Sequence, residues 1–148
     1  MKKLLIIIAL IAVGGFADAQ ILQPVKWSYA AKRINAKQAV VYLKATIDNG
    51  WHIYSQDIAA NGPTKTVFSF QSSKDYVLDG RTIEPKPIVH FDKMFDMKIG
   101  YFEKAVIFQQ KINIKTTGKI KVKGKLEFGT CDDKQCLPPE QIEFNIAV

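Results

Sequence analysis

Residues 105–128 decide the fold, and they read AVIFQQKINIKTTGKIKVKGKLEF. The stretch divides into two runs, Ala105 to Ile114 and Lys119 to Phe128, with Thr116-Thr117-Gly118 between them. Both runs alternate apolar and polar residues, which is typical of strands with one buried face. A short glycine-containing connection between two such runs predicts a β-hairpin.

The second run shows the clearest alternation in the chain. Lysine occupies every odd position from 119 to 125, and the even positions hold Ile120, Val122, Gly124 and Leu126. Successive residues of a strand point to opposite faces, so the lysines share one face and the apolar residues share the other. The lysines therefore indicate a solvated strand face rather than a binding patch.

Strand-like segments continue on both sides of this stretch, rich in aromatic and β-branched residues. Turn signals separate them at Asn49-Gly50, Asn61-Gly62-Pro63 and Asp79-Gly80. The predicted strands are Val25–Ala30, Gln38–Asp48, Trp51–Tyr54, Thr66–Phe70, Ile88–Phe91, Ala105–Ile114, Lys119–Phe128 and Gln141–Val148. About eight short strands predict an all-β domain. We expect an immunoglobulin-like antiparallel β-sandwich, with a closed barrel as the alternative.

The N-terminus has the pattern of a secretory signal peptide. Lys2 and Lys3 precede an unbroken apolar run from Leu4 to Val13, and Ala17-Asp18-Ala19 offers a small-x-small cleavage site. The run is too short to span a bilayer, which needs about 20 apolar residues. We therefore expect residues 1–19 to be removed and residues 20–148 to form one periplasmic or secreted domain without a membrane span.

The predicted mature domain is basic. Without Lys2, Lys3 and Asp18 it holds 19 basic and 13 acidic residues, a net charge of +6. A basic balance can indicate a nucleic acid or an anionic membrane as partner. The export signal argues against nucleic acid, and the spread of the lysines along the chain argues against both.

Two cysteines, Cys131 and Cys136, lie near the C-terminal end with four residues between them. In an oxidising compartment they should form a disulfide. Such a bond is either a structural staple or a redox reagent. A loop this short stabilises a fold by only about 2 kcal/mol, and its polar sequence would leave the sulfurs accessible for exchange. The residues alone leave both readings open. A lone pair of cysteines is a poor zinc site, so we expect no metal.

Three segments of the chain together resemble a known family. They read FGTCDDKQCLPPE at 128–140, NGWHIY at 49–54 and FDKMFD at 91–96. They resemble the active-site segment, an aromatic segment and the cap loop of the periplasmic N-terminal domain of the thiol:disulfide interchange protein DsbD. The resemblance covers most of the predicted mature chain and is strongest in its last 60 or so residues. The cysteine spacing is one residue shorter than in the best-known branch of the family.

The resemblance implies an immunoglobulin-like fold and a function in electron transfer. Cys131 and Cys136 would carry electrons between thioredoxin-fold proteins, as a protein-disulfide reductase of the thiol-disulfide interchange type and without a cofactor. Phe95 would shield the sulfurs, and Tyr54 and His52 would line the same site. Asp92, in the cap segment, is a further candidate for the lining of the site, where a carboxylate near the sulfurs could take a thiol proton. The sequence contains neither the family's transmembrane nor its thioredoxin-like domain, so we expect a separate protein as electron donor.

A function of another class fits the same residues. An exported immunoglobulin-like module that binds a protein through its sheet edge or loops would need the disulfide only to hold a hairpin. The two functions differ in whether the cysteine pair exchanges with other thiols.

Overall fold

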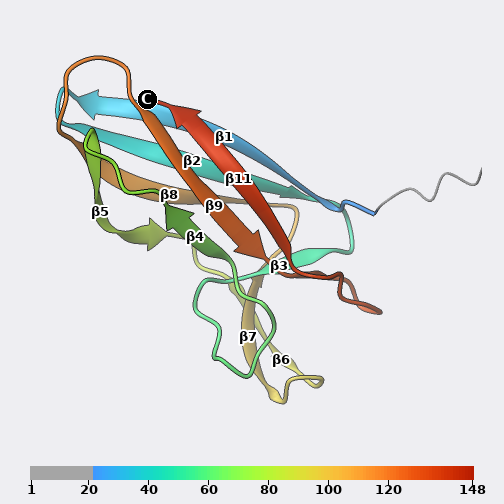
Figure 1. Ribbon diagram of the computed structural model, residues 1–148. Helices are drawn as coiled ribbons and strands as arrows, with labels where there is room; N and C mark the ends of the chain where they lie inside the picture. The colour runs from blue at the N-terminus through green and yellow to red at the C-terminus, as the bar shows by residue number, and fades with distance from the viewer. Residues whose placement is uncertain (1–21) are drawn as a thin grey trace, which may run out of the picture.

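The computed structural model describes residues 22–148, and in this part of the chain all regular secondary structure is β-strand (Figure 1). Eleven strands pair antiparallel throughout. This confirms the all-β, immunoglobulin-like sandwich. The predicted signal peptide of residues 1–19, with the expected cut before Gln20, lies outside the described residues. Residues 22–148 contain no helix capable of crossing a membrane.

Two sheets face each other and enclose the main core. The first has the order β1-β2-β8-β5, and the second has the order β11-β9-β4. Their bounds are β1 Val25–Asn35, β2 Gln38–Ile47, β8 Ala105–Ile114, β5 Tyr76–Ile83, β11 Glu140–Ala147, β9 Lys121–Phe128 and β4 Val67–Phe70.

The main core forms where the inward faces of these two sheets meet. Strand β8 shows the alternation that builds it, since Val106, Phe108 and Ile112 are buried while Ile107 is exposed. Trp27 of β1 packs its ring 5.5 Å from that of Phe128 of β9, across the core. Each such large apolar side chain stabilises the fold by about 1.5–3 kcal/mol when fully buried.

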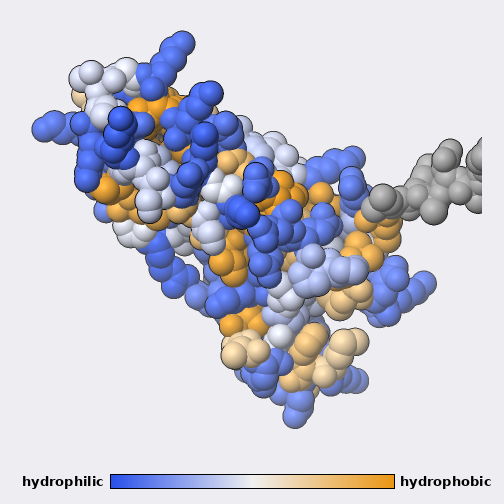
Figure 2. Space-filling view, viewed as in Figure 1, coloured by the Kyte–Doolittle hydropathy of each residue, from blue (hydrophilic) through white to orange (hydrophobic). Residues whose placement is uncertain are grey.

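The lysine face of β9 is as predicted. Lys121, Lys123 and Lys125 are exposed, while Val122 and Leu126 are fully buried. Figure 2 shows hydrophilic side chains over much of the face formed by β9 and β11. This strand lies between β11 and β4 rather than at an edge.

The predicted hairpin between residues 105–114 and 119–128 is wrong. Strand β8 pairs with β2 and β5 in the first sheet, whereas β9 pairs with β11 and β4 in the second. The intervening residues cross from one sheet to the other, with Gly118 at a positive φ of 99°. Alternation shows which face of a strand is buried, but it does not show which strand is its neighbour.

Asp79-Gly80 is also not a turn between strands. It lies inside β5, where the register to β8 shifts between Asp79 and Ile83. Gly80 has a φ of 72°, and a glycine in this conformation is typical of a bulge. The sequence did not predict β5, because a bulged strand interrupts the alternation.

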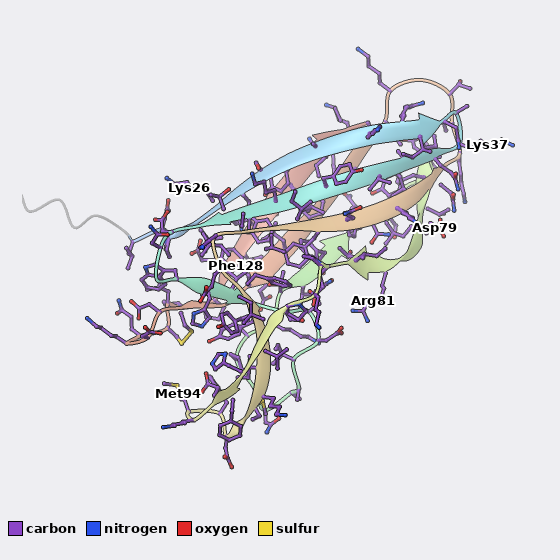
Figure 3. All side chains as sticks on the ribbon, turned by 180° about the vertical axis from the view of Figure 1, so that it is seen from behind. Lys26, Lys37, Asp79, Arg81, Met94 and Phe128 are labelled. Atoms are coloured by element: carbon purple, nitrogen blue, oxygen red, sulfur yellow. A yellow bond between two sulfur atoms is a disulfide. The ribbon has the colours of Figure 1, made fainter. Side chains whose placement is uncertain are left out.

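A third sheet extends from one end of the sandwich (Figure 1), with the order β10-β3-β7-β6. Its strands are β10 Thr130–Cys131, β3 His52–Tyr54, β7 Met97–Phe102 and β6 Ile88–Asp92. Strands β7 and β10 were not predicted. A second, smaller group of buried side chains, Tyr54, Ile58, Ile99 and Cys131, packs here. Figure 3 places Met94, in the β6–β7 loop, at the opposite end of the molecule from Lys37 and Asp79.

Candidate active site

The two cysteines form a disulfide at the end of the third sheet. Cys131 closes the short strand β10, and its Cα lies 4.0 Å from that of Cys136. Asp132 orders the loop between them, since its Oδ1 accepts hydrogen bonds from the backbone N–H groups of Lys134 (2.8 Å) and Gln135 (2.7 Å). These bonds favour the charged carboxylate and lower the pKa of Asp132.

The two sulfur-bearing residues differ in exposure. Cys131 is 4% exposed and belongs to the smaller buried group. Cys136 is an exposed residue of the loop that leads to Pro138 and Pro139. Both prolines follow trans peptide bonds, since none of the bonds described is cis. An approaching thiolate can therefore reach Cys136 directly, while Cys131 is covered by protein.

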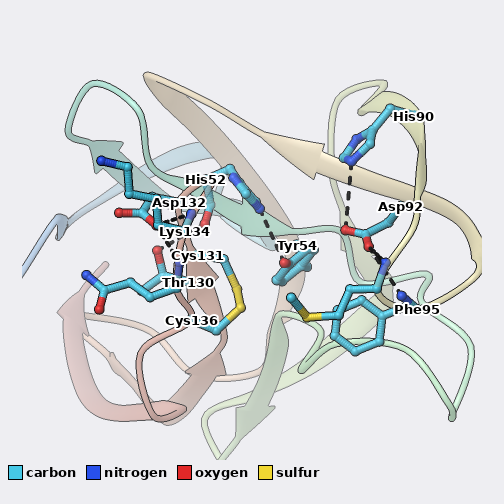
Figure 4. Close-up of a disulfide and its surroundings, with 12 residues drawn as sticks. His52, Tyr54, His90, Asp92, Phe95, Thr130, Cys131, Asp132, Lys134 and Cys136 are labelled. Atoms are coloured by element: carbon cyan, nitrogen blue, oxygen red, sulfur yellow. Dashed lines mark hydrogen bonds and ion pairs between the residues drawn. A yellow bond between two sulfur atoms is a disulfide. The ribbon is translucent and has the colours of Figure 1, made fainter.

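Strand β3 supplies the aromatic wall of the site. It pairs with β10 so that His52 lies opposite Cys131, and the Thr130 hydroxyl donates to the His52 carbonyl at 3.0 Å. Opposite residues of an antiparallel pair present their side chains on one face, and so do residues two apart on a strand. His52 and Tyr54 therefore share the face of Cys131, and Figure 4 shows them beside the disulfide.

His52 and Tyr54 are linked by a hydrogen bond of 3.2 Å between Nε2 and the phenol oxygen. Burial, followed by the charge of Asp92, raises the pKa of Tyr54 to about 12. Burial, followed by repulsion from His90, lowers the pKa of His52. At neutral pH the Tyr54 phenol is therefore protonated, and its O–H can donate the hydrogen bond to a neutral His52 imidazole.

The β6–β7 loop covers the site from the other side. Asp92 Oδ1 accepts hydrogen bonds from the N–H groups of Met94 (2.8 Å) and Phe95 (3.3 Å), which shapes the loop into a turn. Phe95 is half-buried against the group that contains Cys131. Phe91 and Met94, by contrast, are 54% and 78% exposed. Of the two aromatic residues in segment 91–96, Phe95 rather than Phe91 therefore packs against the group that contains Cys131.

All six residues expected at the site line one open pocket of about 540 Å³: Cys131, Cys136, Phe95, Tyr54, His52 and Asp92. A groove of about 620 Å³ between β4, β9 and β11 holds neither cysteine. Within residues 22–148, no cluster of three or more His, Cys, Asp or Glu side chains is suited to hold a metal ion.

Two further residues, Tyr101 and His90, line the same pocket but were not among the site residues expected from the sequence. Tyr101 of β7 lies between two imidazoles, with ring centroids 5.2 Å from His52 and 4.7 Å from His90. His90 Nε2 lies 3.9 Å from Asp92 Oδ2. The only signal for His90 was its position two residues before Asp92, which puts both on one face of β6.

Comparison with known families matches residues 18–147 to the family described as Thiol:disulfide interchange protein DsbD, N-terminal. The chain belongs to this family. No protein among the curated sequences matches it.

Solved structures of DsbD N-terminal domains and a related domain share the fold. The Neisseria meningitidis DsbD N-terminal domain in its reduced form matches with a TM-score of 0.52 and 16% identity, over 81% of this chain and 84% of that one. The complex of the DsbD and PilB N-terminal domains from the same species gives 0.56 and 15%, over 85% and 87%. The N-terminal periplasmic domain of ScsB from Proteus mirabilis gives 0.59 and 18%, over 84% of this chain and 48% of that one.

Proposed function

We propose that this DsbD-type domain passes electrons between thioredoxin-fold proteins by thiol-disulfide exchange at Cys131 and Cys136. The observation that carries the proposal is the pairing of one buried and one exposed cysteine under the β6–β7 loop. A staple needs no such asymmetry and no cover. An exchanging disulfide needs one reachable sulfur and protection for the other.

The reaction has two balanced steps. A donor thiolate attacks the sulfur of Cys136, a donor–Cys136 disulfide forms, and the Cys131–Cys136 bond breaks with its electron pair on Cys131. The donor's second thiolate then attacks the sulfur of the donor's first cysteine in the mixed disulfide, and Cys136 leaves as a thiolate. The donor leaves as a disulfide, and the domain becomes a dithiol that reduces a client by the reverse steps.

The residues around the sulfurs have separate roles in this scheme. Phe95 covers Cys131 and slows oxidation between encounters, because it packs against the buried group that holds this cysteine. Tyr54 and His52 form the opposite wall through their hydrogen bond. Asp92 holds the covering turn in place through its two backbone hydrogen bonds, and its carboxylate is one of those in the pocket that could accept a thiol proton.

The proposed setting is the periplasm, or another oxidising compartment outside the cytoplasm. The pattern of residues 1–19 supports export, and a disulfide of this kind persists in such compartments. Two structures with this fold come from a complex between a DsbD N-terminal domain and a PilB domain and from a periplasmic domain of ScsB. These comparisons support a protein partner and an exported location for this chain.

The first experiment measures the reduction potential of the pair by equilibration in thiol buffers, with alkylated cysteines counted by mass. We expect a value between about −270 and −180 mV, the range of thioredoxin and protein disulfide isomerase. A potential below about −300 mV would identify a staple and leave the non-catalytic binding module as the function.

The second experiment traps the intermediate. Cys131→Ser leaves only the exposed thiol, and Cys136→Ser leaves only the buried one. The partner is a thioredoxin-fold protein that lacks its resolving cysteine and whose remaining thiol is held as a mixed disulfide with 5-thio-2-nitrobenzoate. The variant's thiolate displaces 5-thio-2-nitrobenzoate and forms the protein–protein disulfide, and we expect this to be at least about tenfold faster for Cys131→Ser than for Cys136→Ser. Equal, slow trapping by both variants would contradict the assignment of Cys136 as the entry point.

A further inference from the structure

The charge around the disulfide is opposite in sign to that of the rest of the molecule. Four carboxylates line the pocket that holds both cysteines: Asp92, Glu103, Asp132 and Asp133. We call them the acidic rim. They come from three separate elements, namely the end of β6, the residue after β7 and the disulfide loop.

Two lysines lie in the same two loops, Lys93 beside Asp92 and Lys134 between the cysteines. These four carboxylates and two lysines together carry a net charge of −2, with the two histidines neutral. The full chain carries +7, and residues 22–148 carry +6 once Lys2, Lys3 and Asp18 are left out. The remainder of residues 22–148 therefore carries +8, and the molecule is strongly polarised.

The acidic rim acts on the floor of the pocket rather than only on solvent. The charges of Glu103, Asp133 and Asp92 each oppose the lowering of the His52 pKa by burial and by His90. After burial, the charges of Glu103 and Asp133 also raise the pKa of Tyr101. No lysine contributes to either shift. The side chains that surround the sulfurs therefore experience a negative field from several directions.

The acidic rim also surrounds the exposed Cys136, which a redox partner must approach. Cys136 is exposed beside Asp132 and Asp133, and Figure 4 shows Asp132 and Asp92 on opposite sides of the disulfide. A protein that brings its sulfur to Cys136 must place the surroundings of that sulfur against these carboxylates. Charges arranged in this way steer encounter and exclude partners of like charge.

We propose that the acidic rim selects redox partners whose active-site surface is basic, and that Asp133 and Glu103 are specificity-determining residues for the exchange. The inference rests on the proposed function, because it names the partner class of that same site. Asp133 and Glu103 are suited to this role because both are exposed and neither side chain has a hydrogen bond within residues 22–148.

Small disulfides of different charge test the selection without an identified partner. The reduced domain would be oxidised by cystamine, a dication, by the neutral 2-hydroxyethyl disulfide, and by the dianion of 3,3′-dithiodipropionic acid. In each case Cys136 attacks the reagent, one reagent thiol leaves, and Cys131 displaces the second to close the disulfide. Each rate is divided by the rate of the same reagent with 2-mercaptoethanol, which removes the reagent's intrinsic reactivity.

The ratio of the cation rate to the anion rate is the measured quantity. Any effect of the acidic rim on the thiolate population of Cys136 is common to both reagents and cancels. At about 20 mM ionic strength we expect a ratio of about tenfold or more, which should fall toward one at about 0.5 M salt as the charges are screened.

Charge reversal locates the effect. Glu103→Lys combined with Asp133→Lys should bring the ratio close to one or invert it. The control Asp79→Lys combined with Glu127→Lys makes the same change in net charge at exposed positions on the strands of the sandwich and should keep most of the ratio. A ratio near one at low salt, or an equal response to both double variants, would overturn the selection. If even the neutral disulfide fails to oxidise the pair, the proposed function itself fails.

Discussion

At the residue scale, the sequence predicted which side chains belong to the site, but the strand pattern did not predict which residues they contact. The alternation around Trp51 and Ile53 correctly places His52 and Tyr54 on one face. The alternation does not show that this face lies beside Cys131. The two strands are far apart in the sequence, since Thr130, which hydrogen-bonds the His52 carbonyl, lies 78 residues after His52. The resemblance to the family brought the residues together before the structure did. Composition alone would have left His52 as a solvent-side residue.

The lowered pKa of His52 makes stability depend on pH. Folding disfavours the protonated imidazole, so below its ordinary pKa of about 6.5 the unfolded chain binds the proton more readily than the folded one. Stability should therefore fall as pH drops from about 7 toward 5. In His52→Gln this decline should be shallower, as measured by urea unfolding at several pH values. The carboxylates titrate in both proteins, so parallel curves would contradict a buried neutral His52.

At the element scale, the sequence predicted strands well and their partners poorly. The bounds of β8 were predicted to the residue, and those of β6, β9 and β11 to within two residues. The hairpin between β8 and β9 failed because a glycine-containing connection fits a crossover between sheets as well as a turn. Strand β7, Met97–Phe102, was not predicted.

The β6–β7 loop gives a test of shielding. Phe95→Ala should speed alkylation of the reduced cysteine pair by a neutral reagent such as iodoacetamide, by about threefold to tenfold, since removing the ring exposes a buried thiol. Phe91→Ala is the matched control, because it removes an aromatic ring from the same segment that is already 54% exposed. Equal acceleration in both variants would mean that the loop as a whole, rather than Phe95, controls access.

At the scale of the whole molecule, the main core and the redox site are built from separate sets of side chains. The core between the two large sheets contains no cysteine among its buried members, and Cys131 belongs to the smaller group in the third sheet. The sequence predicted the two-layered architecture. It did not predict this third sheet, whose strands are short and come from three distant parts of the chain.

Reduction of the disulfide should therefore leave the sandwich folded. Opening a loop of six residues costs about 2 kcal/mol of unfolding free energy, so the oxidised and reduced proteins should differ by about this amount in urea titrations. The near-ultraviolet signal of Trp27 and Trp51, which pack on the main core, should persist after reduction. A reduced chain that is unfolded at 25 °C would show that the bond holds the domain together.

The crossover between β8 and β9 also has a consequence for the order in which the chain folds. Among the strands of residues 22–148, only β1–β2 and β6–β7 are neighbours joined by short turns. By contrast, β2 must find β8 and β4 must find β9, with Gln38 opposite Asn113 and Phe70 opposite Gly124. Pairings between segments so far apart make folding slow, on the scale of milliseconds to seconds. A chain emerging from its N-terminus can close two hairpins early. It cannot enclose its core until residues 105–128 are available.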